Sequence, residues 1–498
     1  MNEWSAVDQA LVALIASGPV EVREDGEWLP EFAQFRWEFR GEGAHALIHL
    51  WSEGRNLTRR IVGVREQSSE RIVLEVHRFG KRRPSKLAFL HRDTQRAPKL
   101  VSREQFRSRI ERFLLDCFPD ASISGITASA DLNRSFSPKF VRGVMHESCE
   151  DWALLAVPSG EKSAGVEASL AFGLIWLDAV RSPKEGKPVR GLRLFVPEGA
   201  GRTLCERSLA LSPVAFTEIF EVHERDHFVE KLDQRDVGNL KSSLVPRSQV
   251  DSLLSAARED ASRVAALSNA SSEVREAIQQ RALPGGTQAI FAFRGLEFAR
   301  WSAEGFSFGM GKQTRQLDKA SEPALSRLLG QLHLNRNSLA SETEHPLYKR
   351  VPERWLETLI REDPTKLDGQ LDPRFLYSQI PALTSGDRGV LDLLGVTRRG
   401  RLVVIELKAS EDIQLPMQAI DYWLRVRRHQ QEGTFQHYGY FPGLELDPKP
   451  PLVWLVAPCF RFRSSSEILL KYLSPEIGVT RIGLNENWRK GIRVLFRH

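Results

Sequence analysis

The chain has 498 residues, of which 41% are hydrophobic and 27% are charged, and its formal net charge is +6. This composition is typical of a soluble globular protein, and the chain is too long for a single core. Four scattered cysteines without a CxxC pair exclude a disulfide framework and a cysteine zinc site, and no apolar run approaches the roughly 20 residues of a membrane span. We therefore expect a cytoplasmic protein of several domains with no membrane contact, whose mildly basic charge suits a polyanionic partner.

The first predicted domain covers residues 1–101 and is rich in β-strands. It begins with a short amphipathic helix that lacks the basic start of a signal peptide. Apolar and aromatic residues then alternate or cluster in four segments separated by turns, which predicts strands. These segments are Phe32–Phe39, Ala46–Trp51, Thr58–Val64 and Arg71–Arg78.

Cations and aromatic residues occur together in this first domain. The cations are Arg59, Arg60, Lys81, Arg82 and Arg83, and the aromatic residues are Trp37, Trp51 and Phe79. Stacking on aromatic rings and neutralisation of phosphates are what a surface for single-stranded nucleic acid requires. An equally good interpretation places the rings in the core and the cations on a solvated face.

Residues 102–240 are predicted to form an α/β domain. The expected order is helix, strand, helix, strand, over Gln105–Phe118, Trp152–Pro158, Leu170–Arg181 and Gly191–Pro197. Such alternation favours a layered α/β architecture.

Residues 241–345 are predicted to connect this domain to the last one. Apolar residues at helical spacing indicate two helices within Ser248–Arg281, and a third helix is expected at Ala320–Leu334. Short strands of a small antiparallel sheet are expected at Ala289–Phe293, Phe298–Trp301 and Gly305–Met310. A polar linker, Ser338–Pro346, leads into the last domain, and its acidic residues are interpreted as solvated.

The last predicted domain, residues 346–498, contains the most informative stretch of the chain. Asp392 lies within an apolar run, and after a turn in which Gly400 can adopt a positive φ, the apolar segment Leu402–Lys408 carries Glu406 and Lys408. Residues two apart on a strand share a face, and a hairpin would bring Asp392 alongside Glu406. Buried unpaired charges lower the stability of the fold, so charged residues in such an apolar segment indicate a functional role.

Two carboxylates and an ammonium group gathered in this way suit a hard divalent cation with oxygen ligands. The lysine can orient or deprotonate a water molecule bound to such an ion. The pattern therefore predicts a site for phosphodiester hydrolysis. The alternative is that Glu406 and Lys408 form a salt bridge on an edge strand with a purely structural role.

The spacing Asp392, thirteen residues, Glu406-Leu407-Lys408 resembles the PD-(D/E)XK nuclease superfamily. Several further segments in the same order make residues 350–460 similar to the catalytic domain of NucS-type endonucleases, which cut branched, flapped or mismatched DNA. These segments are Glu353–Glu357, Gln379, Gly389–Leu394, Val404–Lys408, Gln418 and Tyr422.

This resemblance implies a restriction-endonuclease-like mixed sheet flanked by helices, which binds Mg²⁺ or Mn²⁺. It makes Asp392 and Glu406 metal ligands, assisted by Glu353 and the main-chain carbonyl of Leu407, and it makes Lys408 the catalytic lysine. Gln418 and Tyr422, one helical turn apart, are expected to flank the site. Glu357 stays open as the alternative to Glu353.

Further cations of the last domain are candidates for contacts with a phosphate backbone. Arg425 and Arg428 lie near the end of the helix predicted at 416–430, and Arg461 and Arg463 are two apart on a stretch expected to be extended. The most direct interpretation of the chain is a metal-dependent DNA endonuclease of repair or defence. The alternative is a non-catalytic nucleic-acid-binding protein on a nuclease-like scaffold. RNA stays open as a substrate, and a homodimer would serve to cut both strands.

The elements of residues 102–240 follow the same order as those of the last domain. Setting the predicted strands side by side places Ala156 opposite Glu406 and Pro158 opposite Lys408. This comparison leads to the hypothesis that residues 102–240 are a degenerate nuclease-like copy that has lost its site residues, and a common strand order would be its first requirement.

Overall fold

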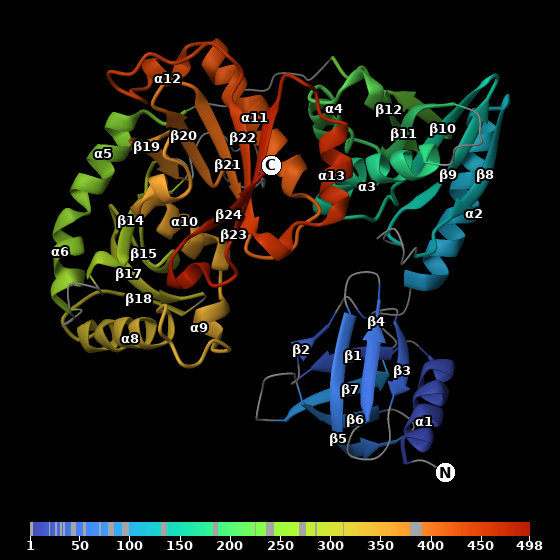
Figure 1. Ribbon diagram of the computed structural model, residues 1–498, viewed down its shortest axis with the longest axis horizontal. Helices are drawn as coiled ribbons and strands as arrows, with labels where there is room; N and C mark the ends of the chain where they lie inside the picture. Colours follow the sequence, from blue (N-terminus) through green and yellow to red (C-terminus); the bar gives the residue numbers. More distant parts are fainter. Residues whose placement is uncertain are drawn as a thin grey trace. The chain divides into compact units, whose positions relative to one another are not determined.

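The structure is a computed structural model, and it describes residues 3–498 except 19, 25–26, 30–31, 33–34, 41–45, 53–55, 69–70, 78–83, 92–98, 131–135, 137, 183–187, 225, 236–243, 268–274, 284–285, 312 and 379–390. The described residues form four β-sheets with helices around them, a mixed α/β multidomain chain as expected (Figure 1). Lys81, Arg82, Arg83, Phe79 and Gln379 lie outside the described residues.

The chain divides into two compact units. The first unit consists of Met1–Trp176, Val180–Glu198 and Phe220–Glu230, and the second consists of Leu177–Ala179, Gly199–Ile219 and Lys231–His498.

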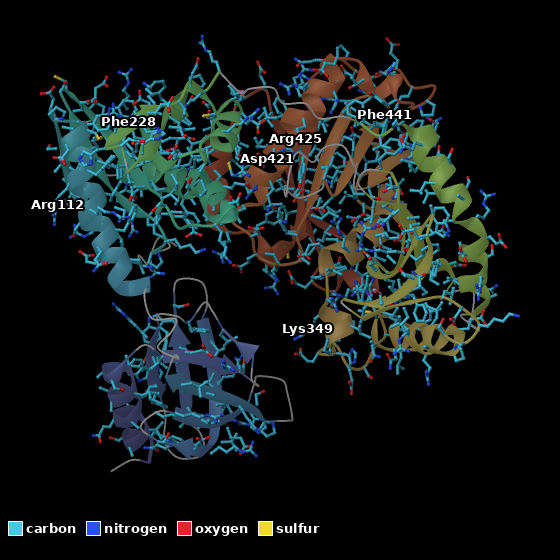
Figure 2. The ribbon with its side chains drawn as sticks, turned by 180° about the vertical axis from the view of Figure 1, so that it is seen from behind. Arg112, Phe228, Lys349, Asp421, Arg425 and Phe441 are labelled. Atoms are coloured by element: carbon cyan, nitrogen blue, oxygen red, sulfur yellow. The ribbon has the colours of Figure 1, made fainter. Side chains whose placement is uncertain are left out.

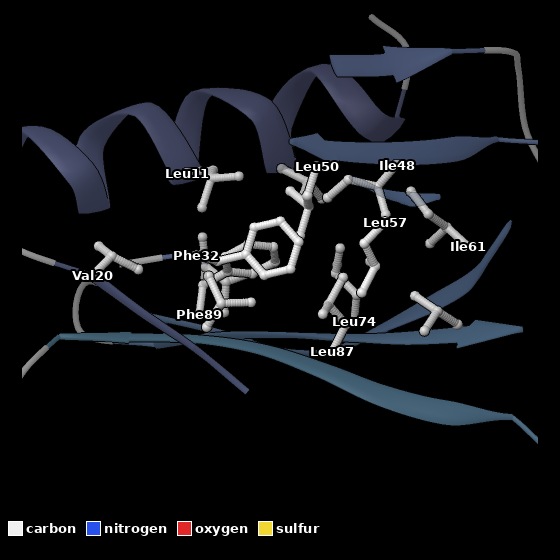
Figure 3. Close-up of a cluster of buried hydrophobic side chains, with 14 of the residues drawn as sticks. Leu11, Val20, Phe32, Ile48, Leu50, Leu57, Ile61, Leu74, Leu87 and Phe89 are labelled. Carbon is white, nitrogen blue, oxygen red and sulfur yellow. The ribbon is translucent and has the colours of Figure 1, made fainter. Parts of the chain in front are cut away.

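The N-terminal sheet is a seven-stranded sheet in the order β2-β1-β7-β6-β5-β4-β3, and all its neighbouring strands are antiparallel. Its elements are α1 (Glu3–Ser17), β1 (Val20–Glu24), β2 (Glu27–Trp28), β3 (Arg36–Arg40), β4 (Leu47–Trp51), β5 (Asn56–Gln67), β6 (Arg71–His77) and β7 (Ser85–His91). Leu11 of α1 packs with Phe32, Leu50 and Leu87 in one buried cluster between the helix and the strands (Figure 3). The β-rich character expected for this region is confirmed, although Phe32 precedes β3 and belongs to the core.

The middle sheet is six-stranded, in the order β13-β12-β11-β10-β9-β8. Its elements are α2 (Lys99–Cys117), β8 (Ala121–Thr127), β9 (Val141–Glu147), β10 (Glu150–Ala156), α3 (Ser163–Arg181), β11 (Val189–Pro197), α4 (Arg202–Ser208), β12 (Thr217–His223) and β13 (Phe228–Lys231). The four predicted elements are present, and β8, β9, β12 and β13 were not predicted.

Among the described residues, α3 is the one helix long and apolar enough to cross a membrane. It packs on the middle sheet, where Gly173 lets the helix approach the strands. A Cβ atom at Gly173 would lie 2.6 Å from Leu192 Cδ2. Half of the apolar window of α3 is buried in the protein.

The third sheet is five-stranded, in the order β14-β15-β16-β17-β18, and is antiparallel throughout. Its elements are α5 (Arg247–Ala256), α6 (Arg258–Leu267), β14 (Ile278–Ala282), β15 (Ala289–Phe293), β16 (Leu296–Ser302), β17 (Gly305–Met310), β18 (Gln313–Gln316) and α8 (Glu322–Asn335), followed by α9 (Pro346–Lys349). The predicted small sheet is confirmed. The expectation of helix as far as Arg281 is wrong, because residues 278–282 pair with β15 along their whole length, and this pairing overrides local propensity.

The last sheet is six-stranded, in the order β19-β20-β21-β22-β23-β24. Its elements are α10 (Pro352–Glu362), β19 (Leu371–Ser378), β20 (Leu393–Thr397), β21 (Leu402–Leu407), α11 (Leu415–Gln431), α12 (Thr434–His437), β22 (Leu452–Pro458), α13 (Ser464–Lys471), β23 (Gly478–Leu484) and β24 (Val494–Arg497). Strands β21, β22 and β23 are parallel, and the other pairs are antiparallel. A parallel pair needs a crossover connection, which α11 provides between β21 and β22.

Both faces of β21 are covered, which explains its nearly continuous apolar sequence. Val403 and Ile405 share a core with Trp355 of α10. Val404 shares a different core with Tyr422 of α11. Because side chains alternate along a strand, Glu406 projects to the face of Val404 and α11.

The middle and last sheets have the same order of elements along the chain. Apart from the short α12 that follows α11 in the last sheet, each consists of a helix, three strands, a helix, a strand, a helix and two strands. The strands follow one another in space as they do in sequence. In both sheets the first three strands are antiparallel, and the third and fourth are parallel. The common strand order required of a duplicated fold is therefore present.

Candidate metal centre

The hairpin β20–β21 places the two carboxylates expected from the sequence opposite each other. Leu393 pairs with Ile405, so the same antiparallel register continued by one residue sets Asp392 against Glu406. The Leu407 amide donates to Asp392 Oδ2 at 3.0 Å.

The turn of this hairpin depends on a glycine, as the sequence predicted. Gly400 has a φ of +83°, and a Cβ atom there would lie 2.2 Å from the Glu445 carbonyl oxygen. Any side chain at this position would therefore be strained and would collide with the backbone. The hairpin that opposes Asp392 and Glu406 is closed by this residue.

Lys408, the residue after β21, lies beside Glu406 and Asp412. Its Nζ atom lies 3.5 Å from Glu406 Oε1 and 3.6 Å from Asp412 Oδ2. The side chain of Glu406 is 4% exposed, that of Asp392 13% and that of Lys408 18%. All three charged side chains are thus largely shielded from water. Glu406 is the most buried, and Asp392 and Lys408 are slightly more exposed.

Burial shifts the protonation equilibria of these groups. Burial, with Glu357 nearby and Arg354 in partial compensation, raises the pKa of Asp392 to about 6. Burial and the neighbouring Asp392 raise the pKa of Glu406 well above its usual range. Burial acts to lower the pKa of Lys408, but the carboxylates around it, Glu406 first, raise that pKa overall, so the lysine is held as an ammonium ion.

Glu406 has an oxygen that the protein does not satisfy. Its Oε2 atom is buried without a hydrogen-bond partner, and so is Oε1 of Gln418. An unpartnered buried carboxylate oxygen is costly, and oxygen ligands of this kind are those that Mg²⁺ and Mn²⁺ prefer. The pair Asp392 and Glu406 therefore fits a divalent cation. The salt bridge to Lys408 engages only Oε1 and leaves Oε2 unexplained.

The helix α10 brings two further carboxylates toward this pair, in different ways. Glu353 Oε1 accepts from the Ala409 amide at 3.2 Å, immediately after Lys408. Glu357 is buried and binds Arg354 Nη1 at 2.7 Å, and the same nitrogen lies 3.5 Å from Asp392 Oδ1. A guanidinium group thus stands between Glu357 and Asp392.

The described carboxylates of this site do not all converge as ligand atoms. Among the described residues, the one group of three whose ligand atoms lie within 4.8 Å of one another is Glu221, His223 and Glu230. Glu353 consequently does not close a three-carboxylate cage with Asp392 and Glu406. The structure brings Asp392, Glu406 and Lys408 together and leaves Glu353 beside them.

Tyr422 and Gln418 come from α11, the helix over the face that carries Glu406. Tyr422 is buried, and burial together with Glu406 and Asp392 raises its pKa far above the usual range, so its hydroxyl stays protonated and can donate a hydrogen bond. Gln418 is one helical turn away. Both residues lie where the sequence placed them, on the helix over the candidate site.

The comparisons with known proteins find nothing. The chain matches no protein-family model, no curated protein and no solved structure.

The cations proposed for nucleic-acid contact are placed unevenly. Arg425 and Arg428 are half-buried on α11, and Arg425 follows Asp421 by one turn of that helix (Figure 2). The prediction that Arg461 and Arg463 lie on one extended stretch is wrong for Arg461, because residues 459–461 form a 3₁₀ turn. Phe462 and Arg463 do have extended backbone angles. Arg461 Nε lies 3.8 Å from Glu486 and Arg463 Nε lies 3.1 Å from Glu411, so nearby acids partly neutralise both.

In the N-terminal sheet, two of the candidate groups have structural partners. Arg59 donates to both carboxylate oxygens of Glu24, at 2.7 and 3.0 Å. Trp37 packs against the core and donates from Nε1 to Asp8 Oδ1 at 2.8 Å. For these two residues the structure favours the core interpretation. Arg60 is exposed.

Sequence reasoning missed several charged residues that the fold gathers. Arg354 and Asp412 approach the candidate site, and the only signal for them was their closeness in sequence to Glu353 and Lys408. Glu221 and His223, two apart on β12, meet Glu230 of β13 across a turn. The spacing of Glu221 and His223, two residues apart, could have indicated that they share one face of a strand, but β12 and β13 were not predicted.

Proposed function

We propose that residues 346–498 form a divalent-metal-dependent nuclease with a restriction-endonuclease-like fold, which hydrolyses phosphodiester bonds of DNA. The observation that carries this proposal is the buried, opposed pair Asp392 and Glu406, with one unpartnered oxygen on Glu406 and the Lys408 ammonium beside it. The mixed sheet covered by α10 and α11 supports it. Charges kept in an apolar setting at the expense of stability are characteristic of functional sites.

Asp392 and Glu406 would hold Mg²⁺ or Mn²⁺ through their carboxylate oxygens. Such an ion supplies a more acidic bound water and offsets the charge of the reacting phosphate. Lys408, kept protonated by the acids around it, donates hydrogen bonds to the attacking water or to a phosphate oxygen and does not serve as the base. Tyr422 adds a neutral hydroxyl donor on the same face.

Cleavage assays with labelled forked, mismatched and single-stranded DNA, and with RNA of the same sequence, test this proposal. We expect cleavage of DNA that requires Mg²⁺ or Mn²⁺ and falls at least about 100-fold in Asp392→Asn and Lys408→Ala. Glu476→Gln, an exposed acid in the turn before β23, is the matched control and should cleave like the wild type. Equal cleavage by all four proteins would reveal a contaminant, and binding without cleavage would favour a non-catalytic nucleic-acid-binding protein.

A further inference from the structure

The middle sheet can be aligned residue by residue with the last sheet through equivalent backbone hydrogen bonds. At the end of the third strand, the Val157 amide donates to the Phe195 carbonyl at 2.8 Å, and the Lys408 amide donates to the Val456 carbonyl at 3.0 Å. Two residues earlier, Leu155 pairs with Leu194 and Glu406 pairs with Leu455. Val157 therefore occupies the position of Lys408, and Leu155 that of Glu406.

The neighbouring antiparallel strand gives the third equivalence. Leu155 pairs with Arg142, in the way that the register of the last sheet sets Glu406 against Asp392. Arg142 consequently occupies the position of Asp392. The pairing of Ala156 and Pro158 with Glu406 and Lys408, expected from the sequence, is wrong by one residue.

The faces of the strands agree with this corrected alignment. Ala156 belongs to the core shared with Phe106 of α2, just as Leu407 belongs to the core shared with Trp355 of α10. Leu155 therefore points to the opposite face, toward α3, as Glu406 points toward α11. A shift of one residue would exchange these faces.

The three positions that carry Asp392, Glu406 and Lys408 in the last sheet carry other kinds of side chain in the middle sheet. Arg142 is 5% exposed, and its Cζ atom lies 4.8 Å from the centre of the Phe136 ring and 5.7 Å from that of Trp176. Leu155 and Val157 are buried and apolar. A guanidinium ion between aromatic rings repels a divalent cation, and none of the three side chains offers an oxygen ligand.

From this correspondence we propose that the middle sheet is a non-catalytic copy of the last one, so that a single copy of the chain carries one hydrolytic centre and nicks duplex DNA one strand at a time. The proposal rests on the nuclease function proposed for residues 346–498. Each event adds one water across one phosphodiester: a new P–O bond forms, one P–O bond breaks, and the leaving oxygen takes a proton. Cutting the second strand then requires a second, separate event.

Cleavage of supercoiled plasmid in Mg²⁺ tests directly whether the two strands are cut in separate events. We expect nicked circles to accumulate before linear DNA appears. Asp392→Asn should abolish nicking by at least about 100-fold, whereas Arg142→Leu, if folded, should nick within about twofold of the wild-type rate. Metal-dependent nicking retained by Asp392→Asn, or linear DNA formed without a nicked intermediate, would overturn the proposal.

Anomalous scattering from crystals of the wild-type chain soaked in Mn²⁺ gives a readout that does not depend on activity or on a variant's folding. The proposal predicts a manganese peak between Asp392 and Glu406 and none among Arg142, Leu155 and Val157. Peaks at both positions would overturn the single centre while leaving the nuclease function standing. Absence of a peak at both would overturn the nuclease function itself, and the single centre with it.

Discussion

Glu406 is a buried carboxylate that we expect the last sheet not to need for its stability. It is buried beside Asp392, and only one of its oxygens has a hydrogen-bond partner. Removal of its charge without a change of shape should relieve repulsion in the core. We expect Glu406→Gln to raise the free energy of unfolding by about 1 kcal/mol or more without metal, while abolishing cleavage.

Urea unfolding monitored by tryptophan fluorescence measures the expected gain in stability, and the cleavage assay measures the expected loss of activity. Glu476→Gln should change neither quantity. A less stable but fully active Glu406→Gln protein would mean that the carboxylate is structural.

The raised pKa values of Asp392 and Glu406 give the metal-free protein a specific pH dependence. Because both pKa values are higher in the folded state than in the unfolded chain, the two groups favour folding when protonated. This contribution is lost as the pH rises from about 4 through the folded value of Asp392, about 6, and beyond it for Glu406. Metal binding requires the deprotonated forms, so it is expected to be weak at the lower end of this range.

Thermal melts with and without Mn²⁺ measure this dependence. We expect Mn²⁺ to raise the melting temperature by several degrees at about pH 8 and by much less at about pH 5. In Asp392→Asn the shift at the higher pH should disappear. A shift that is the same at both pH values would contradict the assignment of these carboxylates as ligands.

At the scale of elements, the β20–β21 hairpin is the part of the fold that sets the site. Gly400→Ala would place a methyl group against the Glu445 carbonyl at a positive φ. We expect a loss of about 2 kcal/mol or more in unfolding free energy, with reduced cleavage, because the turn fixes the register of Asp392 against Glu406. Gly369→Ala, where a Cβ atom meets nothing within 4 Å, is the matched control. Equal stability of the two variants in chemical denaturation would refute this role.

Within the second unit, α4 is tied to the site helix α11 by a buried ion pair. Arg207 donates from Nε and Nη2 to the two carboxylate oxygens of Asp421, at 2.7 and 2.6 Å. Removal of either partner leaves a buried charge, so Arg207→Met and Asp421→Asn should each cost about 3 kcal/mol. The double variant should cost less than the sum by at least about 1 kcal/mol in a double-mutant cycle. Strictly additive losses would show that the pair is not coupled.

The elements that sequence predicted well are those whose pattern is independent of distant partners. The apolar segment ending in Glu406 and Lys408, the glycine turn and the helix α11 were all identified from period and composition. Strand β14 was mistaken for helix because its polar sequence becomes a strand only by pairing with β15. Register was the other weakness, since alternation alone did not distinguish Leu155 from Ala156 as the counterpart of Glu406.

The site itself was predictable only where its members lie close in sequence. Asp392, Glu406 and Lys408 are held by one hairpin and were recognised together. Arg354 reaches Asp392 from α10, and its position between Glu357 and Asp392 depends on packing that no spacing rule reveals.

At the scale of the whole molecule, the chain combines two sheets of one strand order with different contents at the same position. One position holds opposed carboxylates and an ammonium, and the other holds an arginine between two rings. The proposed duplication of a fold, followed by loss of one site, would account for both the common order and the difference. It also explains why a chain of this length is expected to have a single hydrolytic centre.

The most direct test of the central claim replaces oxygen by sulfur at the phosphate. Forked DNA with sulfur at the non-bridging positions of the cleaved strand is compared with all-oxygen DNA in Mg²⁺ and in Mn²⁺. Because Mg²⁺ binds sulfur poorly and Mn²⁺ accepts it better, we predict cleavage to fall at least about 10-fold in Mg²⁺ and to recover in Mn²⁺. Equal cleavage of both DNAs in Mg²⁺, or cleavage that persists in a chelator, would contradict a metal ion at Asp392 and Glu406 that contacts the scissile phosphate.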